Sequence, residues 1–295
     1  MLTVDYVIAA YNILMIGVWM PLLGTSGIAR WMALVHFAAL GLPLLLSRAP
    51  VERPAWMRAL VDLYPVLWLG VFWRELGIHW EMVGSAPNDA FIAWLDRAAF
   101  GVNLSALWAP AMPMGWLSET MQFVYFSYYA LFAGLAVVLL LRRNQAITQD
   151  LTLRLSIAYA AAYAVYAVAP TVGPMAMAMF PRFGGEGAHG LFRALNDFLQ
   201  ANGDAAGTAF PSTHTAGAVT LAWLAWRYCP RWVAWTATIL AIGIAPATVY
   251  TQNHFAVDAI CGALLGLWLQ TYVVPRLQDG IRWPARALER APETA

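Results

Sequence analysis

Apolar stretches separated by short polar connections run along most of the chain. Eight of them approach the twenty or so residues with which a helix crosses a bilayer. They cover residues 6–23, 31–46, 59–77, 118–141, 153–169, 213–228, 232–250 and 255–274. The first has no basic region before it and no small-x-small cleavage site, so we expect a retained helix and not a signal peptide. The pattern predicts an all-α, polytopic membrane helix bundle with about eight spans.

The connections predict how the spans are grouped. The segment 47–54, with two prolines, is expected to be a hinge, and the segment 90–100 is short and amphipathic, which predicts a helix at the membrane interface. The Gly- and Pro-rich segment 170–212 is expected to be a loop. We therefore expect two N-terminal helices (residues 1–58), a six-helix core (59–275) and a polar tail (276–295).

Composition agrees with a membrane setting and excludes several classes of protein. The chain is 61% hydrophobic and 11% charged, and its fifteen tryptophans suit a protein with two lipid–water interfaces. A net charge of +1 gives no reason to expect a nucleic-acid partner. Two cysteines, Cys229 and Cys261, support neither a disulfide framework nor a cysteine metal site. Oligomeric state is not indicated.

The distribution of arginine predicts the orientation of the spans. All seventeen basic residues are arginine, and eight spans put both termini on one side. Twelve arginines lie on that side: Arg48, Arg53, Arg58, Arg142, Arg143, Arg154, Arg227, Arg231, Arg276, Arg282, Arg286 and Arg290. Five lie on the other: Arg30, Arg74, Arg97, Arg182 and Arg193. The positive-inside rule then predicts cytoplasmic termini in a plasma or inner membrane.

Two polar strings beside apolar spans carry candidate chemistry. His254 and Asp258 are four residues apart, so on a helix they would share a face, and the carboxylate would hold Nδ1–H and leave Nε2 bare. Pro211 and Ser212 precede the apolar run that contains His214, which predicts a helix start whose N–H groups suit phosphate. The predicted topology places both strings on the extracytoplasmic side. Together they point to phosphoryl transfer.

These strings support a family resemblance. FPSTH at residues 210–214 and HFAVD at 254–258 resemble the second and third motifs of the type 2 phosphatidic acid phosphatase (vanadium haloperoxidase-related) superfamily. Residues 96–101, 124–129 and 163–170 with Pro174 resemble its inositol phosphorylceramide synthase branch. The similarity covers residues 59–266. It implies a six-helix core and a metal-independent mechanism in which His254 attacks phosphorus, Asp258 orients it and His214 protonates the leaving alkoxide.

The chain departs from the phosphatase pattern at the basic residues that would bind phosphate. Ala162, Ala169 and Thr248 stand where that pattern has basic residues. Charge stabilisation is normally a large part of such catalysis, so other groups must supply it. The candidates are Pro211, Ser212 and Thr213 at the helix start, Tyr163, Tyr166, Tyr250, Thr251, Gln252, Asn253, and the arginines Arg74, Arg182 and Arg193.

This departure favours substrates with less negative charge. We expect a lipid phosphotransferase or phosphodiesterase of the inositol phosphorylceramide or sphingomyelin synthase kind, with a phospholipid donor and a lipid hydroxyl or water as acceptor. The alternatives are a phosphatase acting on phosphatidic acid or isoprenyl phosphate, and a non-catalytic lipid-binding relative. Two histidines and an aspartate can also ligate a metal, but no further carboxylate recurs at ligand spacing, so neither metal nor cofactor is expected.

Other polar residues have simpler interpretations. His36, His79 and His189 are expected to be packing residues, and Asp62 and Glu119 to reach the interface. Gly262 and Gly266 form a small-xxx-small pattern on the face of Asp258, which predicts close helix packing behind the site. The aromatic residues at 125–129 are expected to be an interface belt or a lipid contact.

Overall fold

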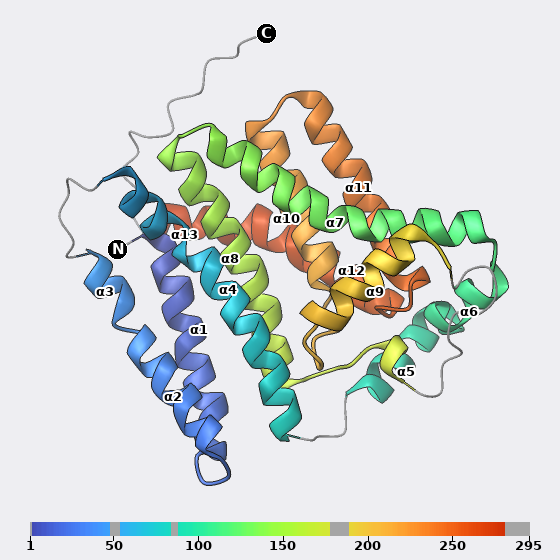
Figure 1. Ribbon diagram of the computed structural model, residues 1–295, viewed down its shortest axis with the longest axis horizontal. Coiled ribbons are helices and arrows are strands. Elements are labelled where there is room, and N and C mark those ends of the chain that lie inside the picture. The colour runs from blue at the N-terminus through green and yellow to red at the C-terminus, as the bar shows by residue number, and fades with distance from the viewer. Residues whose placement is uncertain (1, 48–53, 84–87, 178–188, 281–295) are drawn as a thin grey trace.

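The computed structural model describes residues 2–47, 54–83, 88–177 and 189–280 (Figure 1). Over these residues the all-α prediction is confirmed, with one isolated backbone bridge between Thr171 and Thr208. The α-helices are α1 (Thr3–Trp19), α2 (Gly27–Ala39), α3 (Leu42–Ser47), α4 (Ala55–Val83), α5 (Asp89–Phe100), α6 (Leu104–Ala111), α7 (Gly115–Leu141), α8 (Gln145–Val168), α9 (Leu191–Gly203), α10 (Thr213–Tyr228), α11 (Arg231–Tyr250), α12 (Ala256–Trp268) and α13 (Val274–Gly280). Shorter helical turns are η1 (Met20–Leu22), η2 (Pro174–Ala176) and the π-helical η4 (Leu269–Val273).

Helix α8 is the centre of the bundle, and α1, α4, α7 and α10 all pack on it (Figure 1). Most of its residues are buried. Its middle is rich in alanine, including the buried Ala158, Ala160 and Ala162, and such small side chains let neighbouring helices approach closely. Helix α8 has the apolar sequence of a lipid-facing helix, but other helices enclose it.

Five helices are long and apolar enough to cross a membrane. They are Thr3–Leu22, Gly115–Leu141, Gln145–Val168, Arg231–Tyr250 and Ala256–Asp279. The other three predicted spans differ in length: 31–46 is divided between α2 and α3, 59–77 lies within the longer and more polar α4, and 213–228 is the 16-residue α10. The chain is a membrane protein, and eight spans remain a prediction.

Several predicted boundaries were wrong. The helix at 90–100 is confirmed as α5, but its connection also holds α6, and the predicted loop 170–212 holds the amphipathic α9. Helix α13 continues past Pro275 to Gly280, into the first residues of the predicted tail. The wider π-helical turn immediately before Pro275 leaves room for its ring within a continuous helix. The remainder of the tail, and residues 48–53 of the predicted hinge, lie outside the described residues.

A buried polar cluster attaches the N-terminal helices to the core. His36 on α2 lies 2.5 Å from Glu75 on α4 through Nε2 and 2.7 Å from Asn12 on α1 through Nδ1. The indole N–H of Trp19 also donates to Glu75, and the His79 ring packs edge-on against Trp19. His36 and His79 are therefore packing residues, as predicted. Because the residues of this cluster lie on three helices, α1, α2 and α4, the two N-terminal helices belong to the same bundle as the core.

Helix α12 packs so closely on α10 that its glycines cannot be replaced without movement. A Cβ on Gly262 would lie 2.2 Å from the carbonyl oxygen of Ser212 and 2.3 Å from Oγ1 of Thr215. A Cβ on Gly266 would lie 2.9 Å from the carbonyl oxygen of Ala216. The predicted close packing is confirmed at both positions. It brings the start of α12 against the start of α10.

We expect Gly262→Ala to destabilise the protein, because its methyl group would overlap backbone and hydroxyl oxygen atoms. Overpacking of this kind costs about 1–3 kcal/mol and should lower the midpoint of thermal inactivation in detergent by roughly 5 °C. Gly134→Ala on α7 is the matched control, since a Cβ there meets no atom within 4 Å. An unchanged midpoint for Gly262→Ala would contradict the packing described here.

Candidate active site

His254 lies in a tight turn between α11 and α12. Helix α11 ends at Tyr250, and Gln252 adopts a positive φ of 62°. The carbonyl oxygen of Thr248 accepts hydrogen bonds from the amides of both Asn253 (3.0 Å) and His254 (3.1 Å), which closes the turn. The expectation that His254 and Asp258 share a helical face was wrong, because α12 begins only at Ala256.

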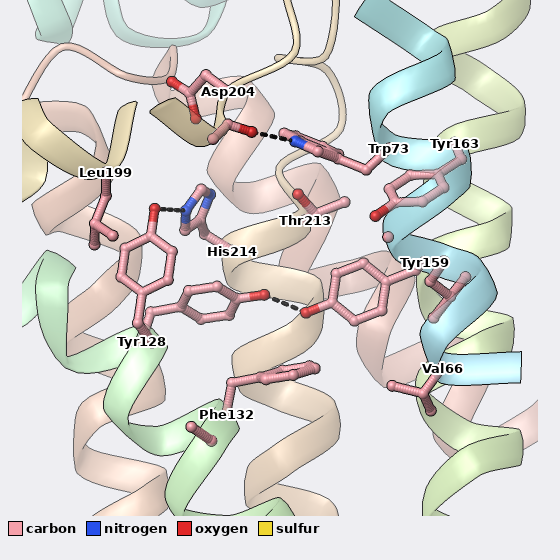
Figure 2. Close-up of a pocket in the computed structure, with 15 residues that line it drawn as sticks. Val66, Trp73, Tyr128, Phe132, Tyr159, Tyr163, Leu199, Asp204, Thr213 and His214 are labelled. Carbon is pink, nitrogen blue, oxygen red and sulfur yellow. Dashed lines mark hydrogen bonds between the residues drawn. The ribbon is translucent and has the colours of Figure 1, made fainter. Parts of the chain in front are cut away.

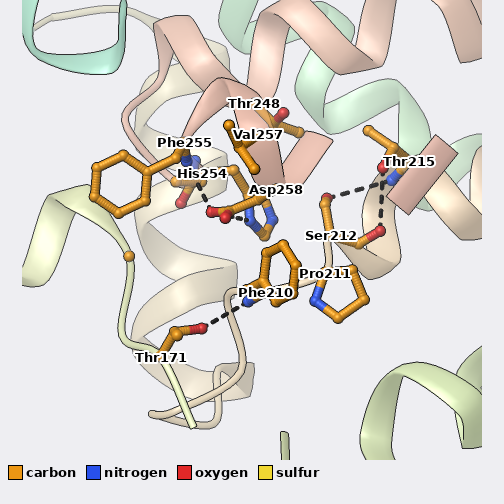
Figure 3. Close-up of polar contacts among 12 residues, drawn as sticks. Thr171, Phe210, Pro211, Ser212, Thr215, Thr248, His254, Phe255, Val257 and Asp258 are labelled. Carbon is orange, nitrogen blue, oxygen red and sulfur yellow. Dashed lines mark hydrogen bonds and ion pairs between the residues drawn. The ribbon is translucent and has the colours of Figure 1, made fainter. Parts of the chain in front are cut away.

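The two residues nevertheless meet, because Asp258 folds back on the start of its own helix (Figure 3). Its Oδ2 accepts the amide N–H of Phe255 at 2.8 Å and lies 3.6 Å from Nδ1 of His254. That second distance is an ion-pair contact longer than a hydrogen bond. Asp258 is fully buried, and the imidazole turns Nδ1 toward it. Nε2 is thereby left as the nitrogen available to the cavity.

The second motif starts α10 as predicted. Ser212 is the N-cap, and its Oγ accepts from the amide of Thr215 at 3.4 Å. The amide of Ser212 donates to the carbonyl oxygen of Asp258 at 3.1 Å, so one backbone hydrogen bond joins the two motifs. His214 is the second residue of α10. Its ring centroid lies 5.6 Å from that of His254. Proton transfer at one ring and attack by the other can therefore act on the same phosphoryl group.

Tyrosines of α7 surround His214. The hydroxyl of Tyr125 lies 3.1 Å and that of Tyr129 3.5 Å from Nε2 of His214, and the Tyr128 ring packs against the imidazole at 4.6 Å between centroids. Nδ1 of His214 is buried and has no hydrogen-bond partner among the described residues. The aromatics predicted as a belt or lipid contact thus contact this histidine through Nε2 and the face of its ring.

Two adjoining cavities meet at His214, and Figure 2 shows the larger of them. The larger, of about 560 Å³, is bounded mainly by aromatic and aliphatic side chains and by His214. The smaller, of about 450 Å³, reaches both His214 and His254. Four residues border both cavities: Trp73, Asp204, Thr213 and His214. Both volumes are within the usual range for sites that bind small molecules.

The structure brings only some of the predicted binding residues to these cavities. Thr213 borders both, Asn253 the smaller and Tyr163 the larger. The others have structural contacts. Pro211 and Ser212 shape the start of α10, and Tyr166 donates to the carbonyl of Pro211. Tyr250 donates to the carbonyl of Met112, Thr251 to that of Ala247 and Gln252 to that of Ser105. Tyr250, Thr251 and Gln252 border neither cavity. Their hydroxyls and amide instead hold the turn and its neighbours.

Asp204 is a site residue that sequence reasoning missed. It follows the last residue of α9, and its carboxyl borders both cavities (Figure 2). Enclosure by protein raises the pKa of Asp204 to about 6, although a charged His254 would act in the opposite direction. The amphipathic segment that ends at Gly203 was the available signal, because a helix there would present the next residue at its C-terminus.

Helix α9 is held in place by contacts at both ends. The Glu119 carboxylate on α7 accepts the amide of Phe192 at 2.6 Å, and the Asn196 side chain donates to Gln122. At the other end the Trp73 indole donates to the carbonyl of Gly203 at 2.7 Å. Glu119 thus anchors a helix, and the fixed α9 positions Asp204.

Two aspartates of α5 support the site from outside. Asp89 accepts the amides of Val172 (2.9 Å) and Gly173 (2.7 Å), in the segment that pairs with the approach to α10. Asp96 accepts the amide of Val257 at 3.1 Å, in the first turn of α12. Burial raises the pKa of both carboxyls, and these amide donors oppose the shift. Both residues act by positioning backbone next to the histidines.

The two candidate arginines that the structure describes border neither of the cavities at the histidines. Arg74 is exposed on α4, Arg193 pairs with Asp197, and Arg182 lies outside the described residues. Among the described residues that border the two cavities there is no arginine. Across the described ranges, no group of three or more His, Cys, Asp or Glu residues has an arrangement that could hold a metal. The acidic residue among the described residues that border the cavities is Asp204.

Comparison with known protein families identifies the family to which this chain belongs. A family model described as the PAP2 superfamily matches residues 91–271. The chain belongs to the PAP2 superfamily. The match begins in α5 and includes both histidine motifs, whereas the resemblance was expected from residue 59. Searches of curated proteins and of solved structures found no match.

PAP2 membership supports an enzyme, since members are generally phosphatases or phosphotransferases. It does not select the inositol phosphorylceramide synthase branch. The match also leaves out α4, although Trp73 of that helix borders both cavities of this PAP2 protein. Part of the site is therefore built by a helix outside the matched region.

Proposed function

We propose that this PAP2 protein is a membrane lipid phosphotransferase or phosphodiesterase that acts on phosphodiester head groups, like inositol phosphorylceramide or sphingomyelin synthases. One observation carries the proposal. His214 and His254, the second of them backed by Asp258, border a cavity that includes Asp204 and, among its described residues, no arginine. The site is proposed to face the extracytoplasmic side, with both termini in the cytoplasm, as the arginine distribution predicts.

The first half-reaction is proposed to form a phosphohistidine. Nε2 of His254 attacks phosphorus, and the bond between phosphorus and the glyceride oxygen breaks. Protonated His214 gives its proton to that oxygen, so the diglyceride leaves as an alcohol. Asp258 holds the His254 ring and stabilises the positive charge that the ring acquires.

The second half-reaction reverses these roles. His214, now neutral, takes the proton of a lipid hydroxyl or of water, and the acceptor oxygen attacks phosphorus. The phosphorus–nitrogen bond breaks and His254 is regenerated, as microscopic reversibility requires. Transfer to a lipid and hydrolysis therefore differ only in which hydroxyl reaches His214.

Charge favours a phosphodiester over a phosphomonoester. A monoester carries about −1.5 to −2 at neutral pH, whereas a diester carries a single negative charge. A phosphatase would balance the larger charge with cations at the phosphoryl group. Here Asp204 adds a further negative charge whenever it is ionised, which repels a monoester more strongly. A buried aspartate paired with a cavity histidine also argues against a non-catalytic relative.

The test compares two lipids with the purified protein: a diacyl phosphodiester and phosphatidic acid, each supplied with a lipid alcohol or water. We expect the diester to be turned over at least about tenfold faster. Asp204→Asn should raise monoester turnover relative to diester turnover, because it removes the repelling charge. Asp197→Asn is the matched control, since Asp197 lies on α9, is half exposed and borders neither cavity.

The pH dependence has a defined direction. As pH falls through about 6, Asp204 takes up a proton, so the wild-type ratio of monoester to diester turnover should rise. A phosphomonoester also titrates near pH 6, so the measured quantity is the difference between wild type and Asp204→Asn at each pH. This difference should shrink below pH 6. Efficient cleavage of phosphatidic acid with no action on diesters would favour the phosphatase alternative.

A further inference from the structure

The larger cavity changes in polarity from one end to the other. His214, Thr213 and Asp204 lie at one end (Figure 2). Val66 of α4 and Phe132 of α7 lie at the opposite end. Tyr159 of α8 lies between them. A site of this form matches a molecule with a reactive polar group at one end and hydrocarbon at the other.

This cavity also reaches the outer surface of the bundle. Its walls are α4 and α7, which both pack on α8 (Figure 2). Gly70 on α4 and Ala133 on α7 border the cavity and are exposed. Since α7 is one of the helices apolar enough to span a membrane, an opening at Ala133, within that span, would face lipid hydrocarbon.

The two cavities differ in which histidine they reach. The larger touches His214 but not His254, and the smaller touches both. In the proposed reaction, the oxygen that exchanges a proton with His214 belongs to the diglyceride in the first half and to the lipid alcohol in the second. That oxygen carries the hydrocarbon in both cases. The head group is bonded to His254 between the two half-reactions, on the side of the smaller cavity.

We propose that the cleft between α4 and α7, with Gly70 and Ala133 at its opening, binds a hydrocarbon chain of the diglyceride and later of the acceptor lipid. This proposal rests on the proposed function. A chain gains little hydrophobic free energy on moving from bilayer to cleft, because lipid tails are as apolar as the wall. The cleft therefore guides the reacting oxygen to His214, and its effect is on turnover of lipids with long chains.

Gly70→Phe tests this assignment. A Cβ at Gly70 meets no atom within 4 Å, so the ring can enter the cleft without displacing the helix. Turnover of a diacyl phosphodiester in vesicles should fall about tenfold, and turnover of methyl p-nitrophenyl phosphate, which has no hydrocarbon chain, should change less than about twofold. Ala133→Phe, from the opposite wall, should do the same. Gly134→Phe is the control, because Gly134 is exposed on α7, has equal space and borders neither cavity.

A second measurement does not depend on catalysis. In His254→Ala, a vesicle phospholipid with a photoreactive diazirine on its acyl chain should cross-link to α4 and α7 near Gly70 and Ala133, and Gly70→Phe should remove this labelling. Loss of turnover on both substrates alike, unchanged lipid turnover, or cross-links confined to other helices would overturn the cleft assignment. If wild type turns over neither diester but the cross-links appear, the proposed function fails and the chain-binding cleft stands.

Discussion

His254→Ala should abolish turnover and should prevent any covalent attachment of phosphate to the protein. The imidazole is the proposed nucleophile, and without it the phosphohistidine intermediate cannot form. We expect a loss of at least about ten-thousandfold in kcat, as when a nucleophile of a catalytic triad is removed. The measurement is turnover of a phosphodiester lipid, combined with ³²P labelling of the quenched protein.

His189→Ala is the matched control for this variant. His189 is exposed ahead of α9 and borders neither cavity, so its removal should change neither turnover nor labelling. Asp258→Asn is a further test of the proposal, because it keeps the side-chain volume but removes the charge that faces Nδ1 of His254. Retained ³²P labelling in His254→Ala would show that another residue is the nucleophile.

His214→Ala should be nearly as damaging with lipid substrates, yet it should still allow His254 to be labelled by a donor with a good leaving group. A p-nitrophenolate departs without a proton, so the first half-reaction does not require His214. The second half does, because the acceptor hydroxyl must lose its proton. We therefore expect a phosphoenzyme that forms from a p-nitrophenyl phosphodiester and then persists.

The lifetime of that intermediate is the decisive quantity. Wild type should show a burst of p-nitrophenol followed by steady turnover, whereas His214→Ala should show the burst and then a rate lower by about a thousandfold. Tyr125→Phe is a useful comparison, because it removes one contact with Nε2 of His214 and leaves the imidazole in place. Rapid turnover of the phosphoenzyme in His214→Ala would overturn its assignment as acid and base.

The sequence predicted those parts of the candidate site whose geometry depends on residues close together in the chain. The start of α10 at Ser212, the reach of Asp258 to His254, and the close contact at Gly262 all depend on residues a few positions apart or on side-chain size. The contact between His254 and Asp258 forms for a different reason from the one that the sequence predicted. His254 precedes α12, and it is the helix cap formed by Asp258 that brings the pair together.

The substrate-binding residues were predicted less well, because a hydroxyl or amide near a motif can donate its hydrogen bond to any acceptor within reach. Tyr250, Thr251 and Gln252 adjoin His254 in sequence but donate to backbone carbonyls away from the cavities. A buried donor left unpaired costs roughly 1–3 kcal/mol, so the nearest carbonyl decides where it points. Adjacency in sequence does not show which carbonyl that will be.

By itself, the sequence determined that the chain is a helical membrane protein and located its candidate chemistry in two histidine motifs and an aspartate, because span length, helix caps and apolar periodicity are local properties. Only the tertiary structure decided what surrounds the histidines. Trp73, Tyr125 and Asp204 lie on three separate helices or their ends. They converge because α4 packs on α8, α9 packs on α7, and α7 packs on both α8 and α10. Packing between helices depends on the fit of whole surfaces, which no short stretch of sequence contains.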